Sequence, residues 1–118
     1  MSVKLRQIAY ARSGDKGSSA NIGVIAYTEE GYHFLEKWLL PEKVYFFFQP
    51  LGVKNVLRYE LPNLLALNFI LEDCLAGGGS RSLRFDSQGK ALGQAILEMQ
   101  IEMPDAVLER IRGGVRDG

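Results

Sequence analysis

The stretch "ARSGDKGSSANIGVIAY", residues 11–27, joins the most polar segment of the chain to its most apolar one. Residues 13–19 carry almost no apolar side chain, whereas residues 22–26 are apolar at successive positions. A strand that is apolar on both faces is typical of the centre of a covered sheet. We therefore expect a buried strand at residues 22–27, paired antiparallel with residues 3–9 across a long polar loop.

The polar loop has two interpretations. Gly, Ser and Asp are the usual residues of a solvated hairpin connection. Binding residues also concentrate on loops that are held by a rigid strand, and glycine N–H groups can turn toward an anion that Lys16 would then help to bind. The loop is not a P-loop, because the order G-x-x-x-x-G-K-[ST] is absent and no helix is expected after it.

Length and composition limit the class of protein. A chain of 118 residues is expected to form one domain, here residues 1–118. Its 14 basic residues balance 14 acidic ones, which gives no electrostatic argument for nucleic acid or an anionic membrane. A single cysteine, Cys74, cannot form an intramolecular disulfide, and no apolar run reaches the roughly 20 residues of a membrane span. We expect a cytoplasmic protein.

Aromatic residues are concentrated in the second of two expected helices. Thr28 is expected to cap a helix that runs to about residue 39, and Pro41 begins the next one. Residues 45–48 are all aromatic, so they cannot all face one core. This run predicts a homodimer or larger oligomer in which some of the rings are covered.

The second half of the chain is harder to interpret. Residues 63–79 fit a helix and also alternate as a strand does, and their length favours the helix. The remaining expectations are strands at 55–61, 80–85 and 95–103, a turn at 86–90, a short helix after Pro104, and a frayed tail at 113–118. Together these elements predict an α+β fold, a two-layer sandwich of a mainly antiparallel sheet with helices on one face.

Two further polar clusters are candidates for a site. "GGGSRSLRFD", residues 77–86, places Arg81 and Arg84 after three glycines, and arginine binds phosphate or carboxylate bidentately. The alternative is a helix end followed by solvated arginines on an edge strand. Asn63 and Asn68 form the other cluster, and a buried asparagine can instead fasten a neighbouring loop. The candidate ligand-binding residues are Gly14, Asp15, Lys16, Gly17, Asn21, Asn63, Asn68, Arg81 and Arg84.

Residue spacing shows no catalytic machinery. His33 is the only histidine and is expected on the solvated flank of a helix, and no cluster has metal-ligand spacing. We therefore assign no metal, no cofactor and no catalytic residue. Asp15 and Lys16 remain as candidates for an acid–base pair.

Three motifs carry a family resemblance: "ARSGDKGSSANIGVIAY", "YELPNLLALNFIL" and "GGGSRSLRFDSQGKALGQAILEM". In order and spacing they resemble the C-terminal domain of the AtuA family, the acyclic terpene utilisation proteins. The resemblance implies a ferredoxin-like fold and a role in acyl-CoA or terpenoid acid catabolism. This sequence departs from the family pattern at Ser18 and Ser19, where relatives usually have two asparagines.

The resemblance also implies a partner. The domain is commonly the tail of a longer protein, and it also occurs as a small protein beside a separate large one, which is the form this sequence resembles. We expect an accessory domain that pairs with a large AtuA-like subunit and helps to bind an acyl-CoA-like anion. The alternatives are an independent acyl-CoA hydratase-like or lyase-like enzyme and a homo-oligomeric metabolite-binding protein. We also expect Asp15–Gly17, the turn at residues 77–81 and Asn63 to form one polar patch, in which Lys16 and Arg81 would neutralise an anion.

Overall fold

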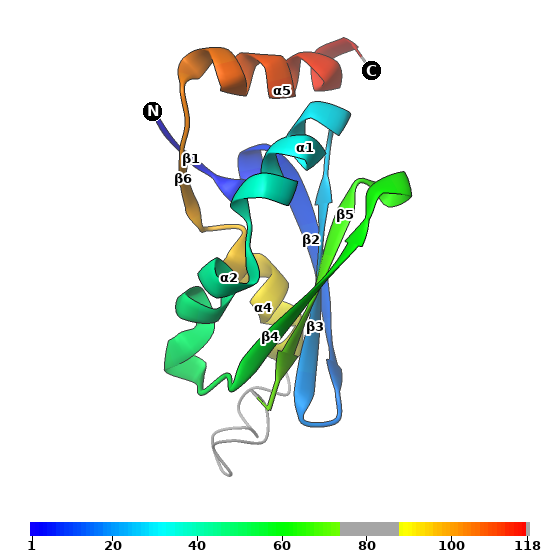
Figure 1. Ribbon diagram of the computed structural model, residues 1–118, viewed down its shortest axis with the longest axis vertical. Helices are drawn as coiled ribbons and strands as arrows, with labels where there is room; N and C mark the ends of the chain where they lie inside the picture. The colour runs from blue at the N-terminus through cyan, green and yellow to red at the C-terminus, as the bar shows by residue number, and fades with distance from the viewer. Residues whose placement is uncertain (74–87, 118) are drawn as a thin grey trace.

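The computed structural model describes residues 1–73 and 88–117, and these form an α+β sandwich (Figure 1). The main sheet has four strands in the order β2-β3-β5-β4, and every neighbouring pair is antiparallel. Helices α1, α2 and α4 lie on one side of this sheet (Figure 1). The predicted fold class is therefore confirmed. The strands are β2 (Ala9–Lys16), β3 (Ser19–Ala26), β4 (Asn55–Leu61) and β5 (Ala66–Glu72).

Strand β3 is central, as predicted, but its partner differs from the expected one. Residues 2–4 form a separate strand, β1 (Ser2–Lys4), which pairs with β6 (Gln100–Glu102). The 3₁₀ turn η1 (Leu5–Gln7) then redirects the chain, and β2 begins only at Ala9, opposite Ala26. The predicted pairing of residues 3–9 with 22–27 is wrong: residues 22–26 pair with residues 9–13, because the turn, in which Leu5 is fully buried, interrupts the expected strand.

The polar stretch is also shorter as a loop than predicted. Residues 13–16 continue β2, and the connection to β3 is only Gly17 and Ser18. Gly17 has a φ of 63°, the left-handed conformation that two-residue hairpin turns require. Backbone ladder bonds do not depend on side-chain polarity, so polar residues extend the hairpin.

Strand β5 lies where a helix was predicted at residues 63–79, of which residues 74–79 lie outside the described residues. A 3₁₀ turn, η3 (Pro62–Leu64), precedes it, and β5 then pairs with β3 on one side and β4 on the other. Its alternate residues Leu67, Phe69 and Leu71 are at most 1% exposed. The helix prediction is wrong because it gave the length of the segment more weight than the alternation of its apolar residues. A strand between two other strands uses that alternation, since successive side chains point to opposite faces of the sheet.

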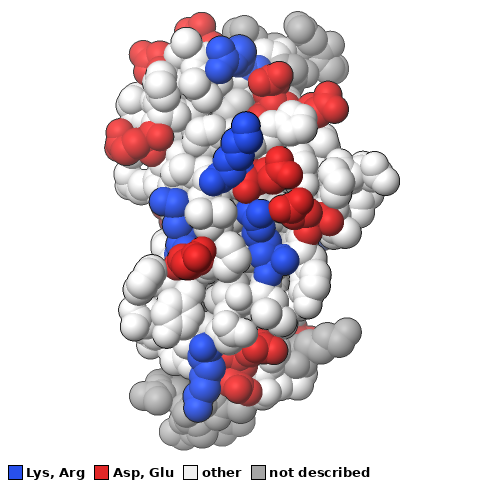
Figure 2. All heavy atoms as spheres, viewed as in Figure 1, with Lys and Arg blue, Asp and Glu red and all other residues white. Residues whose placement is uncertain are grey.

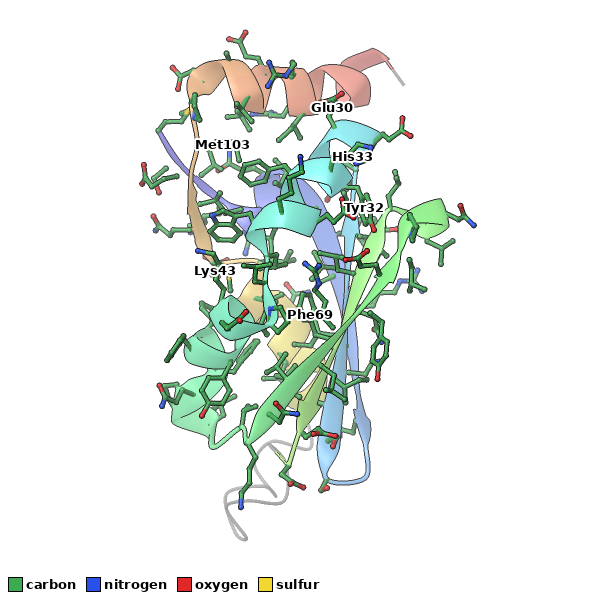
Figure 3. All side chains as sticks on the ribbon, in the orientation of Figure 1. Glu30, Tyr32, His33, Lys43, Phe69 and Met103 are labelled. Carbon is green, nitrogen blue, oxygen red and sulfur yellow. The ribbon has the colours of Figure 1, made fainter. Side chains whose placement is uncertain are left out.

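The helical layer begins as predicted. The Thr28 hydroxyl accepts a 3.0 Å hydrogen bond from the Gly31 N–H and caps α1 (Glu29–Trp38). Pro41 starts α2 (Pro41–Phe48), which is followed by the 3₁₀ turn η2 (Gln49–Leu51). Phe69 of β5 lies between the sheet and these helices (Figure 3).

The C-terminal elements differ from the predictions. Residues 88–90, expected in a turn, begin helix α4 (Gln88–Ile96), and only Gln100–Glu102 of the expected strand at 95–103 is a strand. Burial of Leu92 and Ile96, one helical turn apart, explains why this segment is helical. The last helix, α5 (Asp105–Asp117), extends through most of the expected tail. The strand predicted at residues 80–85 lies outside the described residues.

Arg58 fastens α1 to the sheet. From β4, its guanidinium donates hydrogen bonds to the carbonyl oxygens of Glu36 and Leu39 at 2.9 and 3.1 Å, which caps the C-terminal end of α1. The same group pairs with Glu60 at 2.7 Å. Burial raises the pKa of the neighbouring Tyr32 phenol, and the charges of Glu36 and Glu60 act in the same direction.

The aromatic run of α2 divides between inside and outside. Phe48 is buried, whereas Phe46 and Phe47 are 66% and 37% exposed. Lys43 lies over the Trp38 ring at 4.5 Å from its centroid, next to these exposed rings. The inference that the rings cannot all share one core is consistent with this arrangement, and the oligomer remains a prediction.

Candidate functional site

The face of the sheet away from the helices carries the candidate site. Because side chains alternate along a strand, one cross-strand row on this face consists of Arg12, Gly23, Asn68 and Tyr59. The next row toward the hairpin contains Gly14 and Asn21. The row on the other side contains Ile25, Ala66 and Leu61. Figure 1 shows no described helix over this face.

A hollow of about 430 Å³ spans these three rows. Its lining combines one arginine, two asparagines, two strand glycines and several apolar side chains. The lining residues are Arg12, Ser13, Gly14, Asn21, Gly23, Ile25, Leu61, Leu64, Ala66 and Asn68. This volume lies within the range of small-molecule sites, about 300–1,000 Å³.

The two glycines of the pocket are not required by the fold. Neither has a positive φ, unlike Gly17 and Gly52. A Cβ added at Gly14 would meet nothing within 4 Å, and at Gly23 its nearest neighbour would be Asn68 Oδ1 at 3.7 Å, an ordinary contact. Glycine within a strand is destabilising by roughly 0.5–1 kcal/mol relative to alanine. Such a glycine often marks a place where a ligand or another backbone approaches closely.

The polar side chains of the pocket are available for a ligand. Among the described residues, Arg12, Asn21 and Asn68 have no side-chain hydrogen bond or ion pair. Ser13 differs, because its hydroxyl accepts a 2.9 Å hydrogen bond from the Gly93 N–H and is held against α4 on the opposite face. The donors and acceptors that face the pocket are therefore the guanidinium of Arg12 and the two amides.

The structure brings together three of the predicted ligand-binding residues: Gly14, Asn21 and Asn68. Asp15 is exposed and opposes Ala20, so it belongs to the helix-covered face of the sheet and not to the pocket face. Gly17 forms the hairpin turn beside Ser18, whose hydroxyl donates a 3.2 Å hydrogen bond to Asp73 at the end of β5. Lys16 is the last residue of β2, opposite Ser19.

Asn63 does not join the hairpin tip. It lies in η3, next to the end of the sheet where Leu61, Ala66 and Ile25 pair. The hairpin tip lies beyond Ala20 at the opposite end, because β2 and β3 run the full length of the sheet between them. Grouping Asn63 with Asp15–Gly17 in one patch is therefore wrong. The other members of that patch, residues 77–81, and also Arg84, lie outside the described residues.

Sequence reasoning missed Arg12, Gly23 and the apolar end of the pocket at Leu61 and Leu64. A signal for the first two was present. Once residues 12–16 are understood as a strand, a period of two places Arg12 on the face of Gly14, and the same period in residues 19–26 places Gly23 on the face of Asn21. Nothing local to Leu61 or Leu64 indicates that they meet residues from the first hairpin.

The lining residues determine what the pocket can do chemically. Of the lining residues that the structure describes, Arg12 is the one ionisable side chain, and none carries a carboxylate, imidazole or thiol. The pocket can bind an anion through charge-assisted hydrogen bonds, but its lining offers no general base. Among the described residues there is also no group of three or more His, Cys, Asp or Glu side chains placed to hold a metal ion.

Comparison with known families agrees with the fold. The chain matches the model of the AtuA ferredoxin-like domain over residues 3–102. The chain belongs to this family. Both the predicted family and the predicted ferredoxin-like fold are therefore confirmed. No curated protein and no solved structure gives a significant match.

None of the helices that the structure describes is both long and apolar enough to span a membrane. Basic and acidic side chains are interspersed over the face seen in Figure 2, in agreement with the balanced net charge.

Proposed function

We propose that this AtuA ferredoxin-like domain is an accessory binding domain that acts with a separate, larger AtuA-like protein. It contributes part of a site for a small anion. One observation carries this proposal: the pocket on the uncovered sheet face offers Arg12 and two amides without hydrogen-bond partners among the described residues, and no group for proton transfer. Such a lining binds and orients a ligand, and the reacting groups come from the larger protein.

The rim of the pocket supports a protein contact at the same face. Tyr59, Leu61 and Leu64 are 52%, 41% and 65% exposed, although they adjoin one another on or beside β4. Exposed apolar side chains that gather around a hollow are typical of a binding surface. A partner seated on them would enclose the pocket and exclude water, which strengthens each interaction of Arg12.

The test is co-expression and co-purification with a separate, larger AtuA-like protein. Leu64→Glu places a charge on the pocket rim, and we expect it to reduce the recovered complex at least about tenfold, because a charge must be desolvated in the contact. Phe46→Glu is the comparison variant for the other side of the sheet, where Phe46 is 66% exposed on α2 and belongs to the predicted homo-oligomer contact, and we expect it to leave the recovered complex intact. Thermal melting of both variants checks that each is folded.

Two outcomes would overturn the proposal. One is that the wild-type domain and the larger protein purify separately. The other is that Phe46→Glu abolishes the complex while Leu64→Glu leaves it intact, which would move the contact to α2.

A further inference from the structure

The pocket has two chemically different ends. Toward the hairpin it presents Arg12, Asn21 and Asn68, whereas toward η3 it presents Ile25, Leu61 and Leu64. Gly23 lies in the same row as Arg12 and Asn68, next to the row of the apolar end that contains Ile25 and Leu61. Its missing side chain leaves the floor of the pocket as bare backbone, which a ligand can approach closely. A ligand that uses both ends is polar at one extremity and apolar along its body.

The polar end of the pocket favours a ligand with a single negative charge. Among the described lining residues Arg12 is the one cation, and its guanidinium matches a carboxylate with two parallel hydrogen bonds. A phosphate monoester carries nearly two negative charges at neutral pH, and one arginine would leave it undercompensated. The asparagine amides each donate N–H groups, so they complete the shell around a carboxylate without adding charge.

We propose that this pocket binds a free carboxylic acid with a small, compact apolar body. The carboxylate pairs with Arg12 and accepts hydrogen bonds from Asn21 and Asn68. The apolar body lies over Gly23 and packs against Ile25, Leu61 and Leu64. The inference rests on the proposed binding function and names its ligand class. A thioester of the same acid lacks the carboxylate and leaves Arg12 without a partner.

The experiment is a titration of the isotopically labelled domain, followed by amide NMR shifts. The probe is 4-methylpentanoate, a branched acid with one charge. We expect saturable shifts at the backbone amides of Gly14 and Gly23 and at the side-chain amides of Asn21 and Asn68. Acetate keeps the charge without the body, and 4-methylpentanamide keeps the body without the charge. Each should bind at least about tenfold more weakly, because each loses one end of the pocket.

Variants assign the two ends. Arg12→Met keeps most of the stem but removes the charge, and should weaken 4-methylpentanoate binding about tenfold or more. Arg112→Met is the matched control, because Arg112 is exposed on α5, away from the sheet. It should leave the affinity unchanged. Leu64→Ser should weaken 4-methylpentanoate but not acetate, since only the longer acid reaches the apolar end.

Three results would overturn the inference: no saturable shift up to about 20 mM acid, far above the millimolar affinities of minimal ligands; equal binding of acid and amide; or equal weakening by Arg12→Met and Arg112→Met. Inorganic phosphate bound as tightly as the acid would also overturn it. The co-purification experiment is independent of these results. A domain that joins the larger protein but ignores the acid refutes the ligand class alone, and the reverse result refutes the partnership alone.

Discussion

The two faces of the central sheet are built from the same strands, yet they obey different constraints. On the helix-covered face, Ile22, Leu67 and Phe69 are at most 1% exposed, and packing determines their size and shape. On the uncovered face, their chain neighbours Gly23 and Asn68 line a pocket, and no described neighbour requires them. The difference teaches that alternation places a residue on a face, whereas only burial determines what that residue must be. Residues that the fold does not require are available for binding.

The largest expected effect compares adjacent residues of β5. Phe69→Ala removes a fully buried ring and should lower the free energy of unfolding by about 3–5 kcal/mol, through lost burial and the cavity left behind. Asn68→Ala, on the other face, should change it by less than about 0.5 kcal/mol. Urea unfolding of both variants measures the contrast. A loss from Asn68→Ala as large as that from Phe69→Ala would end the distinction between the faces.

Two glycines provide the next comparison. A Cβ at Gly93 would lie 2.8 Å from Ser13 Oγ, so Gly93→Ala should push α4 from β2 and destabilise the domain by about 1–3 kcal/mol. Gly23→Ala fits its surroundings and should be neutral or stabilising by up to about 1 kcal/mol. The melting temperature of each variant shows whether the substitution stabilises or destabilises the domain. If Gly23→Ala also destabilised the domain, the fold itself would require that glycine.

Helix α2 extends the comparison to association. Phe48 packs inside, while Phe46 projects outward. We predict that the wild-type domain sediments as a dimer or larger species at tens of micromolar. Phe46→Ser should weaken association about tenfold or more, roughly 1.4 kcal/mol, without lowering the stability of the subunit. Sedimentation velocity is the measurement, and a monomeric wild-type domain at that concentration would refute the prediction.

The smallest effect concerns a surface cluster beside β1. Glu98 accepts from Lys4 Nζ at 2.8 Å and also pairs with Arg6, and these contacts hold the pKa of Glu98 below its ordinary value of 4.5. A lowered folded-state pKa adds stability above pH 4.5 that disappears as the pH falls through the folded value. Because the cluster is exposed, the effect is small. Glu98→Gln should remove part of the decline in urea midpoint between neutral and acidic pH. An identical decline in both proteins would show that the cluster contributes nothing measurable.

The sequence predicted several elements because their signals are local. Thr28 and Pro41 mark helix starts through hydrogen bonding and a fixed φ, and neither depends on distant residues. The apolar run at residues 22–26 identified the central strand. Gly14, Asn21 and Asn68 were candidates because they belong to polar clusters, which are also local features of the sequence. Family motifs, which are also local strings, gave the family.

Only the tertiary structure decided which segments meet. Residues 66–72 fit two periodicities, and the position between β3 and β4 selected the strand. The same register placed Arg12 beside Gly23 and Asn68, and it moved Asn63 away from the hairpin. These outcomes depend on the pairing of β3 with β5, which joins segments more than 40 residues apart, such as Gly23 with Asn68. A local pattern cannot encode that pairing, because its energy comes from burying one face of every strand at once. The sequence by itself therefore marked Gly14, Asn21 and Asn68 as candidate binding residues, and only the sheet register placed them in one pocket with Arg12 and Gly23.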